Sequence, residues 1–338
     1  MASFKQLQAD DFVISSDSIS ATLWSTANPT LTAFYTSSTQ AASSAGNYYL
    51  SVYQTGSTED SAAVQFDIAY ADSEGSGSTL FNSGIPGKSP SSTVYGQYRS
   101  LVLEDENANF EFGDGTNVVT GSYFWVLSVE RSRYKEKLFP GTFNLTLSGS
   151  GGFGTIQLTD NSNDTTVQTF LGSNRVLQIV SGSNGSAYYS TGYVTDSGSY
   201  GLFLPDIGTV LLNPYAISQS IHVDVNRNFT PSPTNPVTLY SAISGGAAFQ
   251  LNSEETITSD YVFVRSRNSE FNYSENPSFI SGSTGEVIYP QFINSPQVYV
   301  TTVGMYNDAN ELVAVAKLSK PLLKDFTKES LIRVKLDF

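Results

Sequence analysis

Short apolar runs separated by turns rich in glycine and asparagine recur along most of this chain, and they restrict what it can fold into. In residues 64–70 the apolar side chains fall on alternate positions, which predicts a strand with one face on a core and the other in water. Residues 122–129 are mostly apolar on both faces, as in a central strand. Similar runs occupy residues 142–147, 155–158, 176–180, 200–204 and 209–212. Short strands at this spacing indicate antiparallel sheets rather than alternating strands and helices.

We therefore predict an all-β fold of antiparallel β-sandwich domains, with short helices and an N-terminal extended arm. The composition agrees, because 20 Tyr, 21 Phe and 27 Gly accompany a charged content of only 14%. The best helix candidate is residues 90–103, although Thr93, Val94 and Tyr95 within it also suit a strand.

A length of 338 residues exceeds the usual size of one core, which predicts two or three domains. Residues 1–45 are polar apart from two apolar clusters and indicate an N-terminal arm, with an ordinary first pair of strands as the alternative. Residues 46–230 hold the dense strand pattern and form the β-rich main domain or domains. Prolines and glycines between residues 226 and 246 indicate a boundary. Beyond it, residues 247–338 form a C-terminal β unit.

The C-terminal β unit is expected to contain strands at residues 261–264 and 286–289 and to close with a hairpin. Residues 303–319 read as two apolar strands joined by the turn residues 307–310, Asn-Asp-Ala-Asn. The last segment, residues 333–338, alternates charged with apolar side chains, so it predicts a strand with one charged and one apolar face.

Charge is distributed unevenly along the chain. The net charge of −14 argues against a nucleic-acid partner, because that binding needs a positive surface. Residues 301–338 carry six Lys or Arg and five Asp or Glu, about +1, which leaves about −15 on residues 1–300. Such a difference can steer contacts between subunits. No basic segment followed by an apolar one opens the chain, and no apolar run approaches the ~20 residues that span a bilayer. We expect neither a secretion signal nor membrane insertion.

Few residues could carry catalysis. The chain has no cysteine, which excludes thiolate metal sites and cysteine catalysis. His222 is the single histidine; on a strand it would share a face with Asp224, but one histidine without cysteine rarely builds a metal site. Carboxylates at residues 104–106 and 111–114 lie in solvated turns, and residues 160–164 lack the spacing of the helix-loop-helix calcium site. We predict no catalytic residue, no metal site and no cofactor.

Basic side chains are the clearest candidates for contacts with other proteins. Arg131, Arg133, Lys135 and Lys137 alternate, so an extended chain would line four cations along one face. Two interpretations stay open, a strand end that places charges in solvent and a contact with an acidic partner. The basic side chains near the C-terminus could pair with an acidic neighbour in the same way: Lys317, Lys320, Lys324, Lys328, Arg333 and Lys335.

The C-terminal residues also carry a resemblance. Residues 302–306, Thr-Val-Gly-Met-Tyr, precede a polar turn and residues 312–316, Leu-Val-Ala-Val-Ala. A Lys-Pro pair at residues 320–321 and the alternating strand ending in Phe338 follow, and the segment FNYSENPSF lies upstream at residues 271–279. Over residues 261–338 the chain resembles baseplate and tail structural proteins of contractile-tailed bacteriophages, especially phages of cyanobacteria.

The resemblance implies a non-enzymatic virion structural protein of the phage tail, a baseplate wedge subunit assembled in multiple copies in the host cytoplasm. Its partners would be other tail or baseplate proteins and copies of itself, as a homo-oligomer or ring component. The candidate assembly contacts are Arg131, Arg133, Lys135, Lys137, Tyr306, Lys320, Arg333, Lys335 and Phe338. Two alternatives remain open. A carbohydrate-binding tail adhesin would show an open groove with stacked aromatic residues and a carboxylate pair, and the third candidate is a neck or capsid-associated structural protein.

Overall fold

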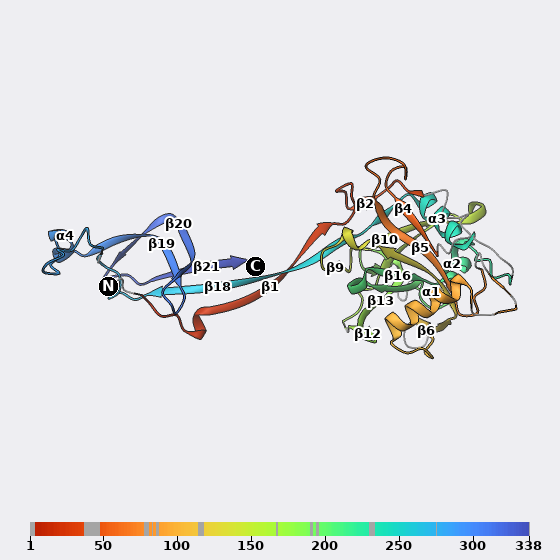
Figure 1. Ribbon diagram of the computed structural model, residues 1–338, viewed down its shortest axis with the longest axis horizontal. Helices are drawn as coiled ribbons and strands as arrows, with labels where there is room; N and C mark the ends of the chain where they lie inside the picture. The colour runs from red at the N-terminus through yellow and green to blue at the C-terminus, as the bar shows by residue number, and fades with distance from the viewer. Residues whose placement is uncertain are drawn as a thin grey trace. The chain divides into compact units, whose positions relative to one another are not determined.

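The computed structural model is mostly β-sheet, with 43% of residues in strands and 17% in helices (Figure 1). The sheets are antiparallel and the helices short, so the predicted all-β class is confirmed. The structure describes residues 4–36, 48–77, 81–82, 84–85, 88–113, 118–166, 168–189, 192–193, 196–229, 234–274 and 276–337.

The chain forms two compact units. We call Ile19–Glu255 the globular unit, and Met1–Ser18 together with Thr256–Phe338 the terminal unit. The division falls within strands β1 (Phe12–Thr22) and β18 (Asn252–Ser266), not at the boundary expected between residues 226 and 246. That region contains helix α3 (Thr234–Gly246), whose apolar side chains lie in the core of the globular unit and keep it there.

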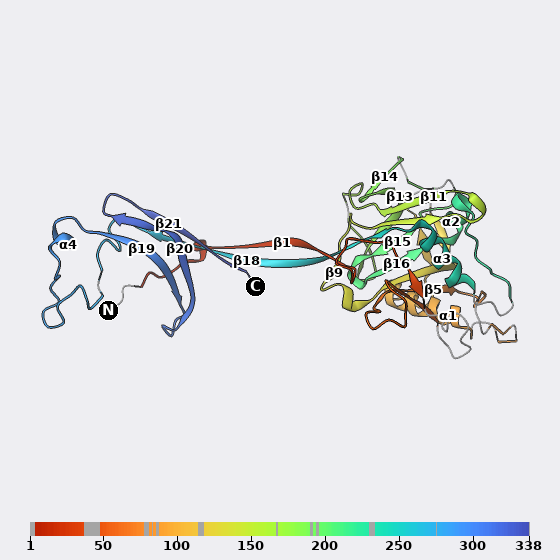
Figure 2. The same ribbon diagram turned by 90° about the horizontal axis from the view of Figure 1, so that it is seen from above.

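The globular unit is built on one large curled sheet of 13 strands (Figures 1 and 2). Along the sheet the strands follow the order β2-β17-β10-β11-β13-β15-β16-β8-β5-β4-β3, and β12 and β14 pair with β13. Their bounds are β2 (Thr30–Leu31), β3 (Tyr35–Thr36), β4 (Tyr49–Tyr53), β5 (Val64–Asp72), β8 (Tyr123–Val129), β10 (Asn144–Ser148), β11 (Thr155–Asp160), β12 (Thr169–Leu171), β13 (Asn174–Ser183), β14 (Ser186–Ala187), β15 (Gly201–Leu204), β16 (Thr209–Leu212) and β17 (Phe249–Gln250).

The two ends of this sheet come together through their aromatic side chains. Phe249 on β17 packs edge to face with Phe66 on β5, at 5.4 Å between ring centroids, although the two strands lie far apart in the strand order. Trp24 lies 5.0 Å from the Phe249 ring, and Phe143 lies 5.7 Å from it. Opposite parts of the curled sheet therefore pack face to face, as the two sheets of a sandwich do.

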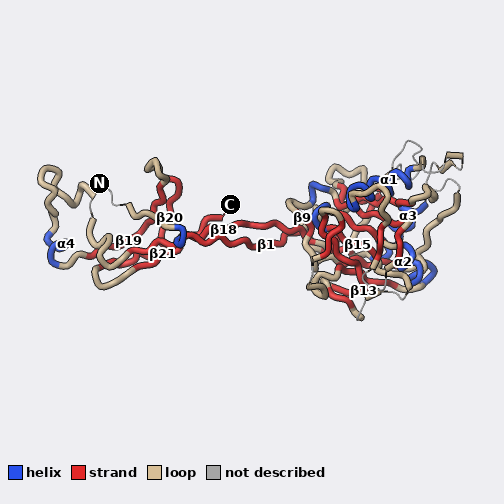
Figure 3. The backbone as a smooth tube through the Cα atoms, turned by 90° about the horizontal axis from the view of Figure 1, so that it is seen from below, coloured by secondary structure: helices blue, strands red, loops and turns tan. Residues whose placement is uncertain are grey.

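Both faces of the sheet are covered. The inner face packs on α2 (Pro214–Ile221) and α3, and the other face packs on α1 (Pro90–Tyr98), the π-helical turn Arg99–Leu103 and the hairpin of β6 (Phe110–Phe112) and β7 (Val119–Gly121). Figure 3 shows the short helices at the margin of the strands of this unit. Turns of 3-10 helix occupy Ala9–Asp11, Arg131–Arg133, Ser150–Gly152 and Pro205–Ile207.

This two-sided cover explains one confirmed prediction and one wrong one. Strand β8 is central, between β16 and β5, with Trp125 in the inner core and Phe124 in the outer one. Strand β5 was expected to keep one face in water, but Ala69 and Ala71 on that face are buried because α1 lies over them.

The helix expected at residues 90–103 is present as α1 and the π-helical turn that follows it.

The terminal unit is made of two thin sheets. In one, β18 pairs antiparallel with β21 (Ser330–Asp337), from Ser259 opposite Asp337 to Ser266 opposite Ser330, and β1 pairs with the other side of β18. In the second, β19 (Gln297–Tyr306) and β20 (Leu312–Asp325) form the predicted hairpin (Figure 1). A short helix, α4 (Pro290–Asn294), precedes it.

The hairpin turn is the one that the sequence indicates, whereas the strand expected at residues 286–289 is wrong. Asn310 takes the left-handed conformation with φ 60°, and the Asn307 amide donates to the carbonyl of Glu311 at 3.0 Å. Residues 286–289 make only one bridge, between Ile280 and Val287, because the chain folds back tightly between residues 281 and 286.

Candidate functional site

The terminal unit buries almost no apolar side chains of its own. Among its described residues, only Val262 and Val334 are buried apolar side chains, and they are direct cross-strand partners of β18 and β21. A chain of about 100 residues usually buries roughly 60–70% of its unfolded surface. Its exposed large apolar side chains are Phe4, Phe12, Val13, Ile14, Phe271, Tyr273, Ile288, Tyr289, Ile293, Tyr299, Tyr306, Leu312, Val313, Val315, Phe326 and Leu331. The described part of this unit therefore lacks a hydrophobic core of its own.

Neither face of the β19–β20 hairpin is buried. Along β19 the burial alternates between half-buried residues such as Val300 and Val303 and exposed ones such as Tyr299, which is 67% exposed. On β20, Val315 is 59% exposed while its neighbours Ala314 and Ala316 are only half-buried. One face of the hairpin is therefore exposed and the other is half-buried. A two-stranded hairpin is at best marginally stable in water unless its apolar surface is covered, so its exposed face needs further cover.

The tip of the hairpin carries a continuous apolar surface. Gly304 lies directly opposite Val315, so the two residues present the same face of the hairpin. The side chains of Tyr306 and Leu312 come within 3.2 Å of where a Gly304 Cβ would stand, so both lie over this glycine. Phe4 packs edge to face on Tyr306, at 4.9 Å between ring centroids. We call these five residues the hairpin-tip patch.

Backbone edges add to the apolar surface. The outer edges of β19 and β20 have no strand partner within the described chain, and β21 is the last strand of its sheet (Figures 1 and 2). Unpaired N–H and C=O groups along such edges are a template for pairing with another chain.

The final strand has the two faces that its sequence predicts. Val334 is buried, whereas Arg333 and Lys335 are exposed on the opposite face. Both cations already have partners, because Lys335 Nζ lies 2.9 Å from a carboxylate oxygen of Asp337 and the Arg333 guanidinium lies 5.4 Å from the centroid of the Tyr261 ring. The hydrogen bond with Asp337 raises the pKa of Lys335.

The other basic side chains near the C-terminus divide into exposed and buried ones. Lys320 is exposed on β20. Lys324, expected to be available to an acidic neighbour, is instead fully buried and donates to the carbonyl of Asn268 at 3.0 Å and to Oδ1 of Asn272 at 2.7 Å. Lys324 thus fixes the loop between these two asparagines. Phe338, the last candidate contact, lies outside the described residues.

The cations of residues 131–137 do not line one face of a strand. Residues 131–133 form a 3-10 turn, which breaks the extended geometry that the prediction required. Arg131 donates to the carbonyl of Tyr134 at 2.5 Å and lies over its ring at 4.6 Å, and Arg133 contacts the hydroxyl of Ser132 at 3.4 Å.

The two lysines that follow are paired within the globular unit. Lys135 Nζ lies 2.7 Å from a carboxylate oxygen of Glu255, and Lys137 Nζ lies 3.7 Å from one of Glu254. Lys137 belongs to β9 (Lys137–Leu138), which pairs with β18 and places Lys137 directly opposite Glu254. These lysines hold β9 beside β18, and their carboxylate partners come from the chain itself.

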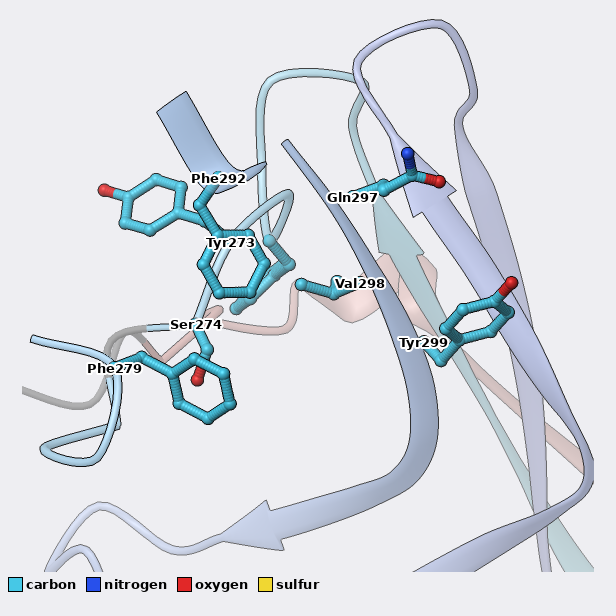
Figure 4. A pocket seen from close by; sticks show the side chains of 8 residues that line it. Tyr273, Ser274, Phe279, Phe292, Gln297, Val298 and Tyr299 are labelled. Carbon is cyan, nitrogen blue, oxygen red and sulfur yellow. The ribbon is translucent and has the colours of Figure 1, made fainter. Parts of the chain in front are cut away.

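An open aromatic hollow of about 490 Å³ lies within the terminal unit (Figure 4). Tyr299 and Gln297 come from β19 and Phe292 from α4, while Phe279 comes from the loop before them. The Phe279 ring packs against that of Phe292 at 5.5 Å. The remaining lining residues are Phe271, Tyr273, Ser274 and Val298, so none of the lining residues is a carboxylate.

The histidine considered for catalysis is a surface residue, but it does not lie on a strand. His222 ends helix α2 in the left-handed conformation with φ 52°, because the chain turns there to leave the helix. Its ring packs on Phe153 at 3.8 Å, and the nearby Asp224 carboxylate accepts a hydrogen bond from Ser218.

Two of the carboxylates considered for catalysis or calcium binding accept hydrogen bonds from backbone amides. Glu104 accepts hydrogen bonds from the amide and hydroxyl of Ser173 at 2.9 and 2.6 Å, which lower its pKa. Asp160 is fully buried and accepts from the amides of Gly141 and Ser162 at 2.8 and 3.0 Å, and its burial raises its pKa. No group of three or more metal-ligating His, Asp or Glu side chains occurs among the described residues.

One buried ionic group was not foreseen from the sequence. Asp72, fully buried at the end of β5, lies 2.7 Å from Nε of Arg227 and accepts from the Tyr70 hydroxyl at 3.2 Å and from the Glu74 amide at 2.9 Å. Burial of the Tyr70 hydroxyl raises its pKa. The Arg227 guanidinium also lies 4.3 Å from the ring centroid of Tyr123. The group ties the segment after α2 to the sheet and is structural.

Comparison with protein-family models, curated proteins and solved structures finds no match for this chain. The helices within the described residues are too short or too polar to cross a membrane.

Proposed function

We propose that this chain is a non-enzymatic structural subunit of a bacteriophage tail, a baseplate component that assembles in multiple copies through its terminal unit. The observation that carries the proposal is the absence of a core in the described part of that unit, together with its exposed apolar side chains and unpaired strand edges. The resemblance of residues 261–338 to phage baseplate and tail proteins supports the assignment to a tail.

The burial pattern favours a permanent assembly over a transient contact. Obligate interfaces resemble a domain core cut in half, and the described part of the terminal unit leaves most of its large apolar side chains exposed. The globular unit has its own core on both faces of its sheet, so it can fold without a neighbour. This combination suits a subunit that folds one unit alone and completes the other on joining an assembly.

The chemistry of the polar side chains supports a structural role as well. Asp160 and Glu104 are occupied by backbone amides, and His222 packs on an aromatic ring at the surface. A general base needs a partner within hydrogen-bond reach of a substrate site, and none of these three lines the aromatic hollow.

The location of the chain can be tested directly on virions. Antibody fragments raised against the globular unit, conjugated to gold, should label the baseplate at the distal end of the tail in electron micrographs of purified particles from the source of this sequence. Fragments raised against an unrelated protein are the control. Label confined to the neck or head would favour the neck or capsid-associated alternative, and unlabelled particles would contradict a virion role.

A carbohydrate-binding adhesin is the second candidate, and the aromatic hollow is the observation that favours it. Aromatic rings with a few polar groups form the usual lining of small-ligand sites, and Gln297 and Ser274 supply polar groups here. The carboxylate pair expected of a depolymerase-like adhesin is missing from the lining residues. Titration calorimetry with host-surface polysaccharide tests it: binding that Tyr299→Ala weakens, while the exposed Tyr189→Ala on the globular unit does not, would support the adhesin.

A further inference from the structure

We infer that the aromatic hollow and the unpaired edge of β19 together bind an extended, uncharged segment of a partner protein, which joins the hairpin as an added β-strand. The inference rests on the proposed function, because it specifies how the terminal unit would hold another protein of the tail. Three features carry it: the position of the hollow along β19, the construction of its walls and the chemistry of its lining.

The hollow runs beside the edge of β19 and not over one face of the hairpin. Gln297, Val298 and Tyr299 are consecutive residues, and all three line it. Successive side chains of a strand point to opposite faces, as Figure 4 shows for Val298 and Tyr299, so a hollow that touches three in a row lies beside the strand. On the other side, Gln297 pairs with Asp325 and Tyr299 with Leu323 of β20. The hollow therefore borders the edge that has no strand partner within the described chain.

One wall of the hollow is an aromatic cluster that is already packed. The Phe279 ring lies 5.5 Å from that of Phe292 and 5.3 Å from that of Tyr289, measured between ring centroids. Both pairs of rings are tilted, an arrangement that aromatic side chains prefer over face-to-face stacking. The cluster can therefore pack against a further aromatic or aliphatic side chain without rearranging.

A buried lysine fixes a second wall. Lys324 donates to the carbonyl of Asn268 at 3.0 Å and to Oδ1 of Asn272 at 2.7 Å. These hydrogen bonds hold the loop that includes Phe271 and leads into Tyr273, two of the lining residues. A site whose walls are preformed loses little conformational entropy on binding, so more of the contact energy appears as affinity.

The lining determines the chemistry of the occupant. Five of its eight residues are aromatic and none carries a charge, so a side chain that enters the hollow is apolar, because a buried charge without a partner is costly. The N–H and C=O groups along the open edge can pair with the backbone of an extended chain, whereas a compact ligand such as a sugar reaches few of them. Strand addition satisfies both requirements, since backbone pairing supplies affinity and pockets for alternate side chains supply specificity.

The test selects binders of the full-length chain from a displayed library of random peptides. Enriched peptides should favour β-branched and aromatic residues and should be uncharged where they face the hollow. In a strand, alternate backbone amides point to the neighbouring strand. N-methylation of one alternating set of amides in a synthetic copy of an enriched peptide should therefore weaken binding about tenfold or more, and N-methylation of the other set should have little effect.

Two substitutions locate the bound peptide on the chain. Gln297→Glu puts a carboxylate into the uncharged lining and should weaken the selected peptide about tenfold or more, because the peptide would remove that charge from water. Gln297 is exposed, so this variant should fold normally. Tyr306→Ala is the matched control, since it removes an exposed tyrosine of the same strand outside the hollow and should bind like the wild type. Hydrogen exchange of the β19 amides compares folding of the free variants.

Each outcome decides the inference. A library from which the wild-type chain enriches no peptide would overturn it, and binding of host-surface polysaccharide in its place would favour the adhesin. Peptides that bind equally after N-methylation of either set would overturn strand addition, and equal binding to Gln297→Glu would overturn the assigned hollow. A chain that labels the baseplate but enriches no peptide would refute this inference alone, whereas a peptide-binding chain absent from virions would refute the proposed function alone.

Discussion

Phe249→Ala is the substitution that should most destabilise the globular unit, because this residue joins the two ends of the curled sheet. Its ring is fully buried and lies against Trp24, Phe66 and Phe143 at 5.0, 5.4 and 5.7 Å between ring centroids. Removal of a buried phenylalanine side chain costs about 3–5 kcal/mol, through lost transfer free energy and the cavity left behind. The three aromatic neighbours come from different segments, so they cannot all close the cavity.

Urea unfolding followed by tryptophan emission measures this loss in the globular unit alone. With a denaturant slope of about 3 kcal/mol per molar, the upper end of the range for small proteins, a loss of about 3–5 kcal/mol lowers the urea midpoint by about 1–1.7 M. Phe170→Ala, at an exposed position, is the control and should leave the midpoint almost unchanged. Equal midpoints for the two variants would refute the claim that the Phe249 cluster holds the sheet closed.

Three further outcomes are expected from the same unit. Asp72→Asn leaves Arg227 without its buried anion. Breaking a fully buried ion pair costs about 3–5 kcal/mol of unfolding free energy, and because Arg227 is partly exposed we expect a loss of about 2–3 kcal/mol. An unchanged urea midpoint would contradict this expectation. Burial raises the pKa of Tyr70 and Tyr98, so the stability that this shift contributes is present below the unfolded pKa of about 10 and is lost as pH rises above it. The part of the tyrosinate absorbance that Tyr70→Phe and Tyr98→Phe remove should appear together with the change in tryptophan emission, and its appearance at lower pH would contradict the expectation. His222→Ala should change unfolding free energy by no more than about 0.5 kcal/mol and leave oligomer mass unchanged, and a lost oligomer would show a role for this surface histidine.

Local patterns in the sequence predicted the elements that depend on nearby residues. The hairpin at residues 303–319 follows from alternating apolar positions on either side of an Asn-rich turn, and its turn residue Asn310 tolerates the left-handed conformation. Strand β8 was recognised as central because both its faces are apolar. The helix at residues 90–103 was predicted only as the best helix candidate, since Thr93, Val94 and Tyr95 also suit a strand; in the structure Pro90 is the first residue of α1, a position that proline favours.

The features that were missed depend on residues far apart in the chain. Asp72 and Arg227 are 155 positions apart, and nothing near either one marks a buried ion pair. The division into two units depends on β1 pairing with β18, so residues at opposite ends of the chain share one sheet. The alternating cations from Arg131 to Lys137 suggested a strand, but hydrogen bonds from Arg131 to nearby carbonyls favour a 3-10 turn instead.

The assembly surface was foreseen in part. The sequence predicted an assembly role for the hairpin and the last strand and selected Tyr306, which lies in the hairpin-tip patch. Arg333 and Lys335 were also selected as assembly contacts, but in the structure their charges have partners within the chain. Exposure of apolar side chains such as Val315 could not be predicted, because an alternating apolar strand looks the same whether its core comes from its own chain or from a neighbour.

Hydrogen exchange of the β19–β20 amides, measured by mass spectrometry at high and low protein concentration, tests most directly whether other copies supply the core of the terminal unit. If they do, mass action stabilises the hairpin only in the assembled state. Its amides should exchange slowly in concentrated wild-type protein, and quickly after dilution or in Val315→Asp, while those of β8 stay protected throughout. Hairpin amides that exchange at the same rate at every concentration and in the variant would contradict the account.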